Sequence, residues 1–419
     1  MKQNLTYKIL QRHTSDKITE PGQIVQCKVD MVLANDITGP LAIRSFEGMG
    51  AKKVFDKDKI ALVMDHFTPQ KDIDSANQVR ISRKFAEEQN LTHYYEGGDS
   101  GVEHTLLPEL GLANPGDLIV GADSHTCTYG GIGAFATGMG STDIAAAMAL
   151  GETWLKVPQV IRVIYDGELA DFVSAKDLML TLIGIIGVDG ALYQGLEFTG
   201  PVIDRLPIEG RLTMANMAIE AGAKTGIFPI DDLLRQWRAE EGLSADLYLE
   251  ADKDAVYAHD VEIDATGLEP VVACPHIPSN VKKISSLPPT EIQQVVIGSC
   301  TNGRYSDLEA AAKVFKGRKV KKGVRCIVLP STPKVWKKAL KNGLIEIFME
   351  AGCIVGPATC GPCLGGHMGI LGDAERAVAT TNRNFKGRMG SLDSEIYLAS
   401  PVSAAASAVL GRVASPAEL

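Results

Sequence analysis

The sequence of 419 residues has little of what marks several special classes of protein. Aromatic residues make up only 6% of it, and its longest apolar stretch, residues 178–188, is interrupted by two glycines. That stretch is too short to cross a bilayer. Residues 1–14 lack the apolar core of a signal peptide. The net charge of −9 disfavours broad binding to phosphate backbones. These absences predict a cytoplasmic protein with no membrane or nucleic-acid partner.

Cysteine is also scarce, with eight residues in the whole chain. Disulfide frameworks are typical of short secreted chains, and a chain of this length can bury a sizeable core without them. In a reducing cytoplasm, cysteines that gather in one place more often bind metal or take part in catalysis. The positions of these few cysteines are therefore informative about function.

The length of the chain predicts about three domains. Val157-Pro158 ends a helical block, and a proline-rich stretch typical of a linker covers residues 275–289. We place the divisions near residues 158 and 284. The expected units are therefore residues 1–158, 159–283 and 284–419.

Short apolar runs of strand length alternate with helical stretches, which predicts an α/β fold with largely parallel sheets. Five of these runs deliver reactive side chains at their carboxyl ends. Ligand sites in open α/β sheets lie beyond the carboxyl ends of the strands. We therefore expect one shared site after five runs: 61–64 before Asp65-His66, 118–120 before Asp123-Ser124-His125, 295–297 before Cys300, 353–355 before Cys360-Gly361-Pro362-Cys363, and 377–379 before Asn382-Arg383.

Helix starts and glycines give further local predictions. Ser306 to Glu309 has the pattern of a capping box ahead of a helix over 310–315, and Ser174 predicts a helix over 175–186. Ser141 or Thr142 is expected to cap an alanine-rich helix over 144–154. The glycines of residues 123–140 do not match the dinucleotide fingerprint. We interpret them as permitting close approach of the backbone to a bulky inorganic group or a substrate.

The pair Cys360-x-x-Cys363 places two thiolates within reach of one metal centre, with Gly361-Pro362 making the turn. Alone, such a pair also occurs in redox proteins, in half of a zinc site, or as two buried cysteines. Cys300 supplies a third thiolate from a separate loop. Three thiolates without an evident fourth fit a [4Fe–4S] cluster that leaves one iron open, because electron-transfer clusters are closed by four cysteines. Cys127 is a less favoured candidate for a fourth ligand.

Two pairs of acidic residue and histidine, Asp65-His66 and Asp123-Ser124-His125, are suited to acid–base chemistry. A carboxylate fixes the tautomer of an imidazole and helps to keep it charged. Arg383 and Arg388 offer two guanidinium groups that can hold carboxylates. Each feature alone is more often structural, but their shared position at strand ends favours a site.

Four motifs together resemble the signatures of the aconitase superfamily: Asp123-Ser124-His125-Thr126, Gly298-Ser299-Cys300-Thr301-Asn302, Cys360-Gly361-Pro362-Cys363 and Asn382-Arg383-Asn384-Phe385-x-Gly387-Arg388. The resemblance implies three α/β domains around a [4Fe–4S] cluster ligated by Cys300, Cys360 and Cys363. It also implies acid–base or water-positioning roles for Asp65, His66, His104, Asp123, His125 and Glu220. Asn216 and Asn302 match residues beside the cluster, and Asn382, Arg383 and Arg388 match substrate-binding groups.

Within that family, the length and motif spacing are most similar to the large subunits of two-subunit hydro-lyases that act on 3-isopropylmalate or homoaconitate. Pro40 and Thr128 stand where aconitases proper carry glutamine and asparagine, which disfavours citrate as substrate. The family's fourth, swivelling domain has no counterpart, so the resemblance implies a separate small subunit in a heterodimer or heterotetramer. Isopropylmalate, in leucine biosynthesis, is the expected substrate. Homoaconitate, dimethylmalate, a cluster-containing RNA-binding regulator and a zinc protein are the alternatives.

Overall fold

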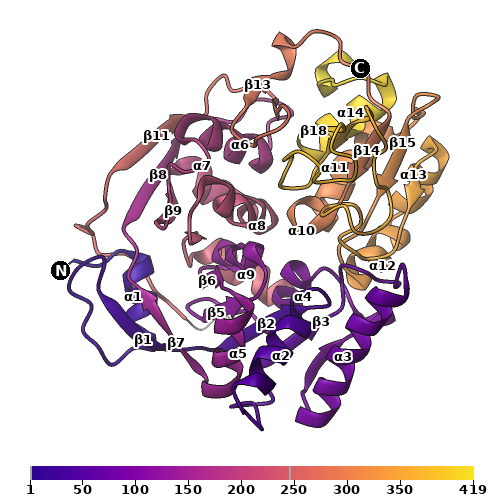
Figure 1. The fold of residues 1–419 in the computed structure, drawn as a ribbon. Helices are drawn as coiled ribbons and strands as arrows, with labels where there is room; N and C mark the ends of the chain where they lie inside the picture. The colour runs from indigo at the N-terminus through magenta and orange to yellow at the C-terminus, as the bar shows by residue number, and fades with distance from the viewer. Residues whose placement is uncertain (1, 245–246) are drawn as a thin grey trace.

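The computed structural model describes residues 2–244 and 247–419, which form three large β-sheets and one two-stranded sheet, with helices packed around them (Figure 1). The first sheet has five parallel strands in the order β4 (His93–Tyr95), β3 (Ile60–Val63), β2 (Met31–Asn35), β5 (Leu118–Gly121) and β6 (Phe135–Gly138). Its surrounding helices are α1 (Leu5–His13), α2 (Gly39–Gly48), α3 (Ile73–Gln89), α4 (Glu103–Glu109) and α5 (Ser141–Leu150). An antiparallel pair, β1 (Ile24–Lys28) and β7 (Glu152–Lys156), flanks it.

The second sheet is parallel and smaller. Its four strands lie in the order β10 (Thr225–Ile227), β9 (Gly195–Thr199), β8 (Val160–Asp166) and β11 (Asp260–Asp264). Its helices are α6 (Ala175–Ile186), α7 (Pro201–Arg205), α8 (Ile208–Asn216) and α9 (Asp232–Glu240). Helix α8 packs directly against the 3-10 segment η2 (Ser124–Ile132) that follows β5 of the first sheet.

The third sheet is mixed and has seven strands. Their order is β13 (Val281–Lys283), β12 (Val271–Ala273), β18 (Glu395–Leu398), β17 (Arg376–Ala379), β14 (Gln294–Ile297), β15 (Arg325–Val328) and β16 (Ile354–Val355). Strand β12 pairs antiparallel with both of its neighbours, β13 and β18, and the other neighbouring strands pair in parallel. Its helices are α10 (Ser299–Asn302), α11 (Tyr305–Phe315), α12 (Pro333–Lys341), α13 (Leu344–Ala351) and α14 (Pro401–Leu410). Helix α10 lies beside α8 at the centre of the molecule (Figure 1).

All five apolar runs predicted from the sequence contain strands, although Met64 and Cys353 lie just outside them, and the α/β prediction is confirmed. Strands β3, β5 and β14 are buried at every position, as expected for parallel strands covered on both faces. The runs do not share one sheet, however. Strands β3 and β5 belong to the first sheet, whereas β14, β16 and β17 belong to the third. The side chains that follow them can therefore meet only where the ends of two sheets face each other.

The helix predictions were right in part. Ser174 does begin α6. Helix α11 begins before the predicted capping box, because the Asp307 carboxylate accepts the backbone N–H of Arg304 at 3.0 Å, which makes Arg304 the N-cap residue. The helix predicted over 144–154 ends instead at Leu150, since Gly151 adopts a φ of 72°. The residues after it form β7, not helix.

Two of the glycines after β5 make close contacts that the sequence did not predict. A Cβ atom on Gly130 would lie 1.9 Å from the carbonyl oxygen of Gly226, and one on Gly131 would lie 2.7 Å from the backbone of Leu212. Gly130 and Gly131 therefore let η2 pack closely against β10 and α8 of the second sheet. None of the described helices has the length and apolar character needed to cross a membrane.

One carboxyl group joins elements around the first and third sheets and makes stability depend on pH. The Thr332 hydroxyl, at the N-cap of α12, donates to Glu109 Oε1 of α4 at 3.0 Å. Burial raises the pKa of Glu109 from 4.5 to about 7. The folded state therefore holds this proton more tightly than the unfolded state does. Its stabilising contribution is complete below about pH 4.5 and is lost as the pH rises through about 7.

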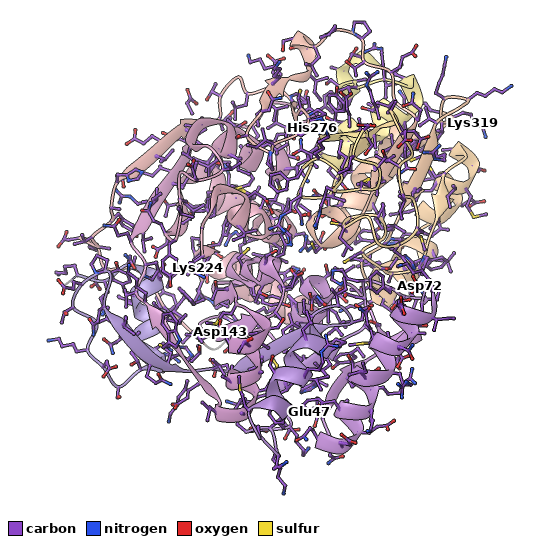
Figure 2. The ribbon with its side chains drawn as sticks, in the orientation of Figure 1. Glu47, Asp72, Asp143, Lys224, His276 and Lys319 are labelled. Atoms are coloured by element: carbon purple, nitrogen blue, oxygen red, sulfur yellow. The ribbon has the colours of Figure 1, made fainter. Side chains whose placement is uncertain are left out.

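Glu109→Gln keeps the acceptor oxygen and removes the titration. We expect the free energy of unfolding in urea to fall less between pH 4.5 and 7 in E109Q than in the wild type. Glu47→Gln, at an exposed position on α2 (Figure 2), is the control and should follow the wild type. Equal pH slopes in E109Q and the wild type would contradict the assignment.

Candidate active site

The loops that follow β3, β16 and β17 meet in one place. The Asp65 carbonyl oxygen, after β3, accepts the Thr359 hydroxyl at 2.7 Å and the Cys360 N–H at 3.1 Å. From the loop after β17, Asn382 Nδ2 donates to Cys300 Sγ at 3.4 Å. The carboxyl ends of the first and third sheets therefore face each other across this point, as the strand-end argument requires.

Cys300, Cys360 and Cys363, here called the cysteine group, lie together with Val102 in a small buried set. Each is only 5–6% exposed. Cys300 follows a tight turn at Gly298, whose φ is 152° and where a Cβ atom would lie 2.6 Å from the Leu329 carbonyl oxygen. A larger residue there would displace the loop, so glycine fixes the position of the Cys300 thiol.

The surroundings of the cysteine group decide the state of its thiols. Burial, with Cys363 and Asp123 nearby, raises the pKa of Cys300 to about 12. Burial, together with Asp65, also raises the pKa of Cys360 well above 9. Without a metal, Cys300 and Cys360 therefore keep their protons near neutral pH. A metal cation that replaces these protons would stabilise the buried thiolates and offset the negative charge of the nearby carboxylates.

Hydrogen-bond donors are aimed at the same sulfurs. Besides the Asn382 amide, the Arg388 guanidinium lies with Nη2 4.0 Å from Cys363 Sγ. Donors of this kind stabilise thiolate ligands rather than thiols. Three converging buried sulfurs with such donors form a set that suits an iron–sulfur cluster. Cys127 lies outside it, because its thiol donates to the Asn216 carbonyl oxygen at 3.5 Å.

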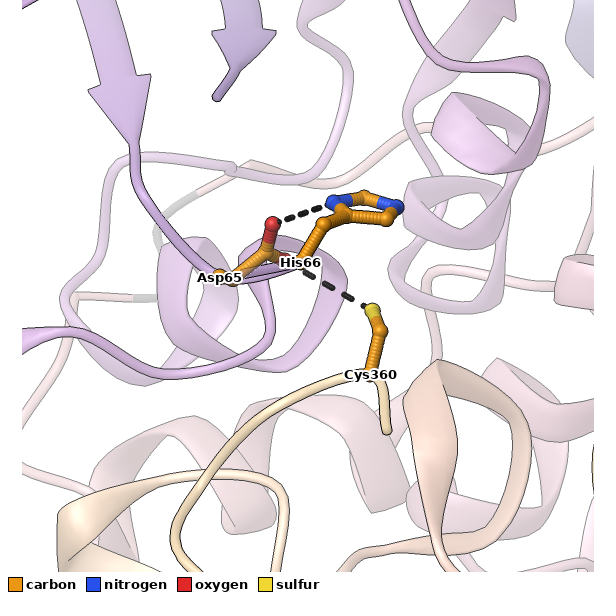
Figure 3. A group of neighbouring side chains, drawn as sticks. All are labelled: Asp65, His66 and Cys360. Carbon is orange, nitrogen blue, oxygen red and sulfur yellow. Dashed lines mark hydrogen bonds and ion pairs between the residues drawn. The ribbon is translucent and has the colours of Figure 1, made fainter. Parts of the chain in front are cut away.

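Asp65 and His66 form a close pair beside Cys360 (Figure 3). His66 Nδ1 donates to Asp65 Oδ1 at 2.6 Å, and Cys360 Sγ lies 3.9 Å from Asp65 Oδ2. Ligand atoms of the three residues all lie within 4.8 Å of one another. Burial lowers the pKa of His66, but Cys360 in the thiolate form that a metal would stabilise, the Asp65 carboxylate, and hydrogen bonds to Asp36 and Asp65 raise it well above 6.5. The imidazole is therefore held in its charged form.

A second chain of hydrogen bonds joins five of the predicted residues. His104 Nε2 donates to Asp123 Oδ1 at 3.0 Å, and the same oxygen accepts the His125 N–H at 2.7 Å. His125 Nε2 donates to Glu220 Oε1 at 2.9 Å, and Arg383 Nε lies 3.1 Å from both oxygens of Glu220. Burial raises the pKa of Asp123, but the two histidines outweigh burial and hold it well below 3.8. Burial lowers the pKa of His104 below 6.5.

The amide side chains connect this chain to the cysteine group. Asn216 Nδ2 donates to the Thr128 hydroxyl at 2.8 Å, and that hydroxyl donates to the His125 carbonyl oxygen at 2.6 Å. Asn216 Oδ1 accepts the Thr301 hydroxyl at 2.9 Å and the Asn382 amide at 3.2 Å. Asn302 points elsewhere: its amide donates to Asp307 at 2.9 Å, and its Oδ1 has no hydrogen-bond partner among the described residues. Among the described residues, Asn302 is therefore the one predicted residue whose hydrogen bonds do not reach the others.

Glu103, Tyr129 and Asp36 belong to this neighbourhood and were not predicted. Burial, with Asp65 and Asp123 nearby, raises the pKa of Glu103 well above 4.5. The Tyr129 hydroxyl lies 3.2 Å from His104 Nδ1, and Asp36 Oδ1 accepts the His66 N–H at 3.1 Å. Asp36 follows β2, so the strand-end rule could have found it. Nothing in the sequence around Glu103 or Tyr129 gives a comparable signal.

The Asp65–His66 pair yields a direct test. Asp65→Asn removes the adjacent negative charge, so we expect the pKa of His66 to fall by about one to three units. NMR titration of histidine-labelled protein measures it. Asp254→Asn, at an exposed position, is the matched control and should leave it unchanged. An unaltered His66 pKa in D65N would show that Asp65 does not keep the imidazole charged.

Comparison with known proteins extends over nearly the whole chain. Residues 7–411 match the model of the aconitase family, described as aconitate hydratase. The chain is 72% identical to the 3-isopropylmalate dehydratase large subunit of Desulfovibrio desulfuricans, over 100% of both chains. It is 66% identical to that of Oleidesulfovibrio alaskensis, over 99% of both, and 56% identical to that of Acetivibrio thermocellus, over 100% of both.

A solved structure is similar in fold. The crystal structure of Thermococcus kodakaraensis aconitase X in its holo-form superposes with a TM-score of 0.51, at 13% identity, over 88% of each chain. At that identity the likeness concerns the fold alone. The sequence matches and the shared fold agree with each other, and the chain belongs to the aconitase family.

Proposed function

We propose that this chain is the large, catalytic subunit of a hydro-lyase that interconverts 2-isopropylmalate and 3-isopropylmalate in leucine biosynthesis. The observation that carries the proposal is the 72% identity to a 3-isopropylmalate dehydratase large subunit over the full length of both chains. The buried acid–base groups beside the cysteine group supply the residue types that dehydration and rehydration need. We also propose a cytoplasmic location.

Membership of the aconitase family implies an iron–sulfur cluster. We propose that Cys300, Cys360 and Cys363 ligate a [4Fe–4S] cluster that leaves one iron without a cysteine. Such an open iron is a Lewis acid that makes a bound hydroxyl group easier to remove. The donor set supports this assignment, because the three sulfurs are buried together and two of them, those of Cys300 and Cys363, receive hydrogen bonds suited to thiolates.

Proton delivery falls to His66. Its charged imidazole, fixed by Asp65 at 2.6 Å, can protonate the hydroxyl that leaves the substrate, and its neutral form can take the proton back from water in the reverse step. The Asp36 carboxylate accepts the backbone N–H of both His66 and Phe67, which holds the loop after β3 in place. His66 thus acts as general acid and general base in turn.

Recognition of the substrate carboxylates is assigned to Arg383 and Arg388, with Asn216, Asn302 and Asn382 as polar neighbours. Glu220 holds the Arg383 Nε, which leaves the terminal nitrogens of that guanidinium available. The Nε of Arg388 is buried without a hydrogen-bond partner among the described residues. His104, Asp123 and His125 form the network that orients Glu220 and, through it, Arg383. Guanidinium groups suit carboxylates because they offer paired, charged hydrogen bonds.

The relatives are named large subunits, and we propose a small subunit as partner, in a heterodimer or heterotetramer. It would carry the swivelling domain and the base that abstracts the substrate proton. Within the chain we propose three units around the cluster, divided near residues 158 and 284. Pairing of β12 with β18 favours moving the second division ahead of Val271.

Anaerobic reconstitution with the candidate small subunit tests the function. We expect hydration of isopropylmaleate and much slower turnover of homoaconitate, dimethylmaleate and cis-aconitate. The loss of double-bond absorbance measures each rate. The chain alone should be inactive. Turnover by the chain alone would contradict the two-subunit proposal, and a preference for homoaconitate would contradict the assigned substrate.

Serine variants test the ligands. In C300S, C360S and C363S we expect bound iron and sulfide to fall and activity to drop more than about a hundredfold, since even outer-shell changes cost 10–100-fold. Cys127→Ser is the matched control: it is equally buried and lies outside the cysteine group. Iron and sulfide analysis after anaerobic reconstitution provides the readout. Full cluster content in C300S would overturn the assignment.

A further inference from the structure

Lys176 occupies a position that is costly for a cation. It is the second residue of α6 and is 0% exposed. The amino end of a helix carries partial positive charge, so a lysine in the first turn is unfavourable there. Taking an ammonium group out of water is a second cost, unless an opposite charge compensates it. An anion close to this side chain would relieve both costs.

No carboxylate of the described residues forms an ion pair with Lys176. Its Nζ donates to the carbonyl oxygens of Thr380 at 2.7 Å and Thr381 at 2.5 Å. The adjacent Asp177 is engaged elsewhere, because its two oxygens accept hydrogen bonds from Ser174 and Val271. Burial lowers the pKa of Lys176 to about 7, against attraction from Asp307, Cys300, Asp177 and Cys363. The protein alone therefore leaves this ammonium without a paired charge.

The carbonyl groups that hold Lys176 belong to the framework of the cysteine group. Thr380 and Thr381 directly precede Asn382, whose amide donates to Cys300 Sγ. The Thr380 hydroxyl oxygen accepts the Gly298 N–H at 2.9 Å, in the turn that presents Cys300. The ammonium thus lies behind the loops that follow β14 and β17. Two of its four attracting groups are Cys300 and Cys363, which would be negatively charged thiolates as metal ligands.

We propose that Lys176 is the buried counter-charge of the iron–sulfur cluster. The inference rests on the proposed function. Three thiolates carry more negative charge than the core of a [4Fe–4S] cluster neutralises, and the Lys176 ammonium, with the amino end of α6, balances part of the excess. Lys176 does not touch the reacting atoms. It acts through the loops of Cys300 and Asn382 and is a positioning residue.

If Lys176 only linked α6 to residues 380–381, its role would be structural. Substitutions at Lys176 distinguish that role from the proposed counter-charge. Lys176→Met removes charge and donors, Lys176→Gln keeps a donor without charge, and Lys176→Arg keeps the charge. If Lys176 is a counter-charge, cluster-free K176M and K176Q should resist heat at least as well as the cluster-free wild type. A structural tie would make both cluster-free variants less stable than the wild type.

In the cluster-bound proteins, by contrast, we expect the wild type to be superior to K176M and K176Q. We expect K176M and K176Q to lose iron to a chelator about tenfold faster than the wild type or more, since truncating one partner of a buried charge pair speeds dissociation. Their cluster reduction potential should be more negative, because the added electron loses a compensating charge, whereas K176R should stay near the wild type. Lys319→Gln, an exposed charge removal in the third-sheet region (Figure 2), should change neither quantity.

The outcomes separate this inference from the proposed function. If K176M does not fold, K176Q carries the test, because it retains a donor for the Thr380 and Thr381 carbonyls. A wild-type chain that loads a cluster normally beside a K176Q of unchanged potential and iron retention would overturn this inference alone. A wild-type chain that takes up no cluster would overturn the proposed function, and this inference with it.

Discussion

The thiols of Cys300 and Cys360, buried next to carboxylates, cannot easily ionise by themselves, and much of the molecule is arranged around that constraint. Burial holds the pKa of Cys300 near 12, and Asp65 and Asp123 add negative charge nearby. A metal centre can supply the missing positive charge. In turn, the thiolates and carboxylates of this region keep the His66 imidazole charged. The chemistry proposed for the site therefore depends on the metal centre, because the charges of the thiolates, carboxylates and imidazole balance only when that centre is bound.

The fold makes this concentration of charge sustainable. The first and third sheets present their carboxyl ends to each other, and η2 and α8 are packed so tightly that only glycine fits at residues 130 and 131. Residues separated by nearly three hundred positions, such as Asp65 and Cys360, are held together by backbone hydrogen bonds. The donors and acceptors of the site are therefore fixed by rigid elements rather than by mobile side chains.

Much of the site could be predicted from the sequence, because its residues share one simple property: they follow apolar runs. Asp65, Asp123, Cys300 and Asn382 all obey that rule. The sequence-based predictions failed where tertiary contacts override the local residue pattern. The close packing of Gly130 and Gly131 against β10 and α8 was not predicted, and Gly151 ended a helix whose alanine-rich pattern continued past it. Nothing local in the sequence marks Lys176, whose significance appears only when its burial and its missing partner are seen together.

The central claim is that three cysteines hold a cluster whose fourth iron is free to meet the substrate. Mössbauer spectroscopy of the chain, reconstituted with isotopically labelled iron and its small subunit, tests it most directly. The account predicts that isopropylmalate alters the signal of one iron site and leaves the others unchanged. A spectrum in which the substrate alters no iron site, or all of them equally, would contradict it.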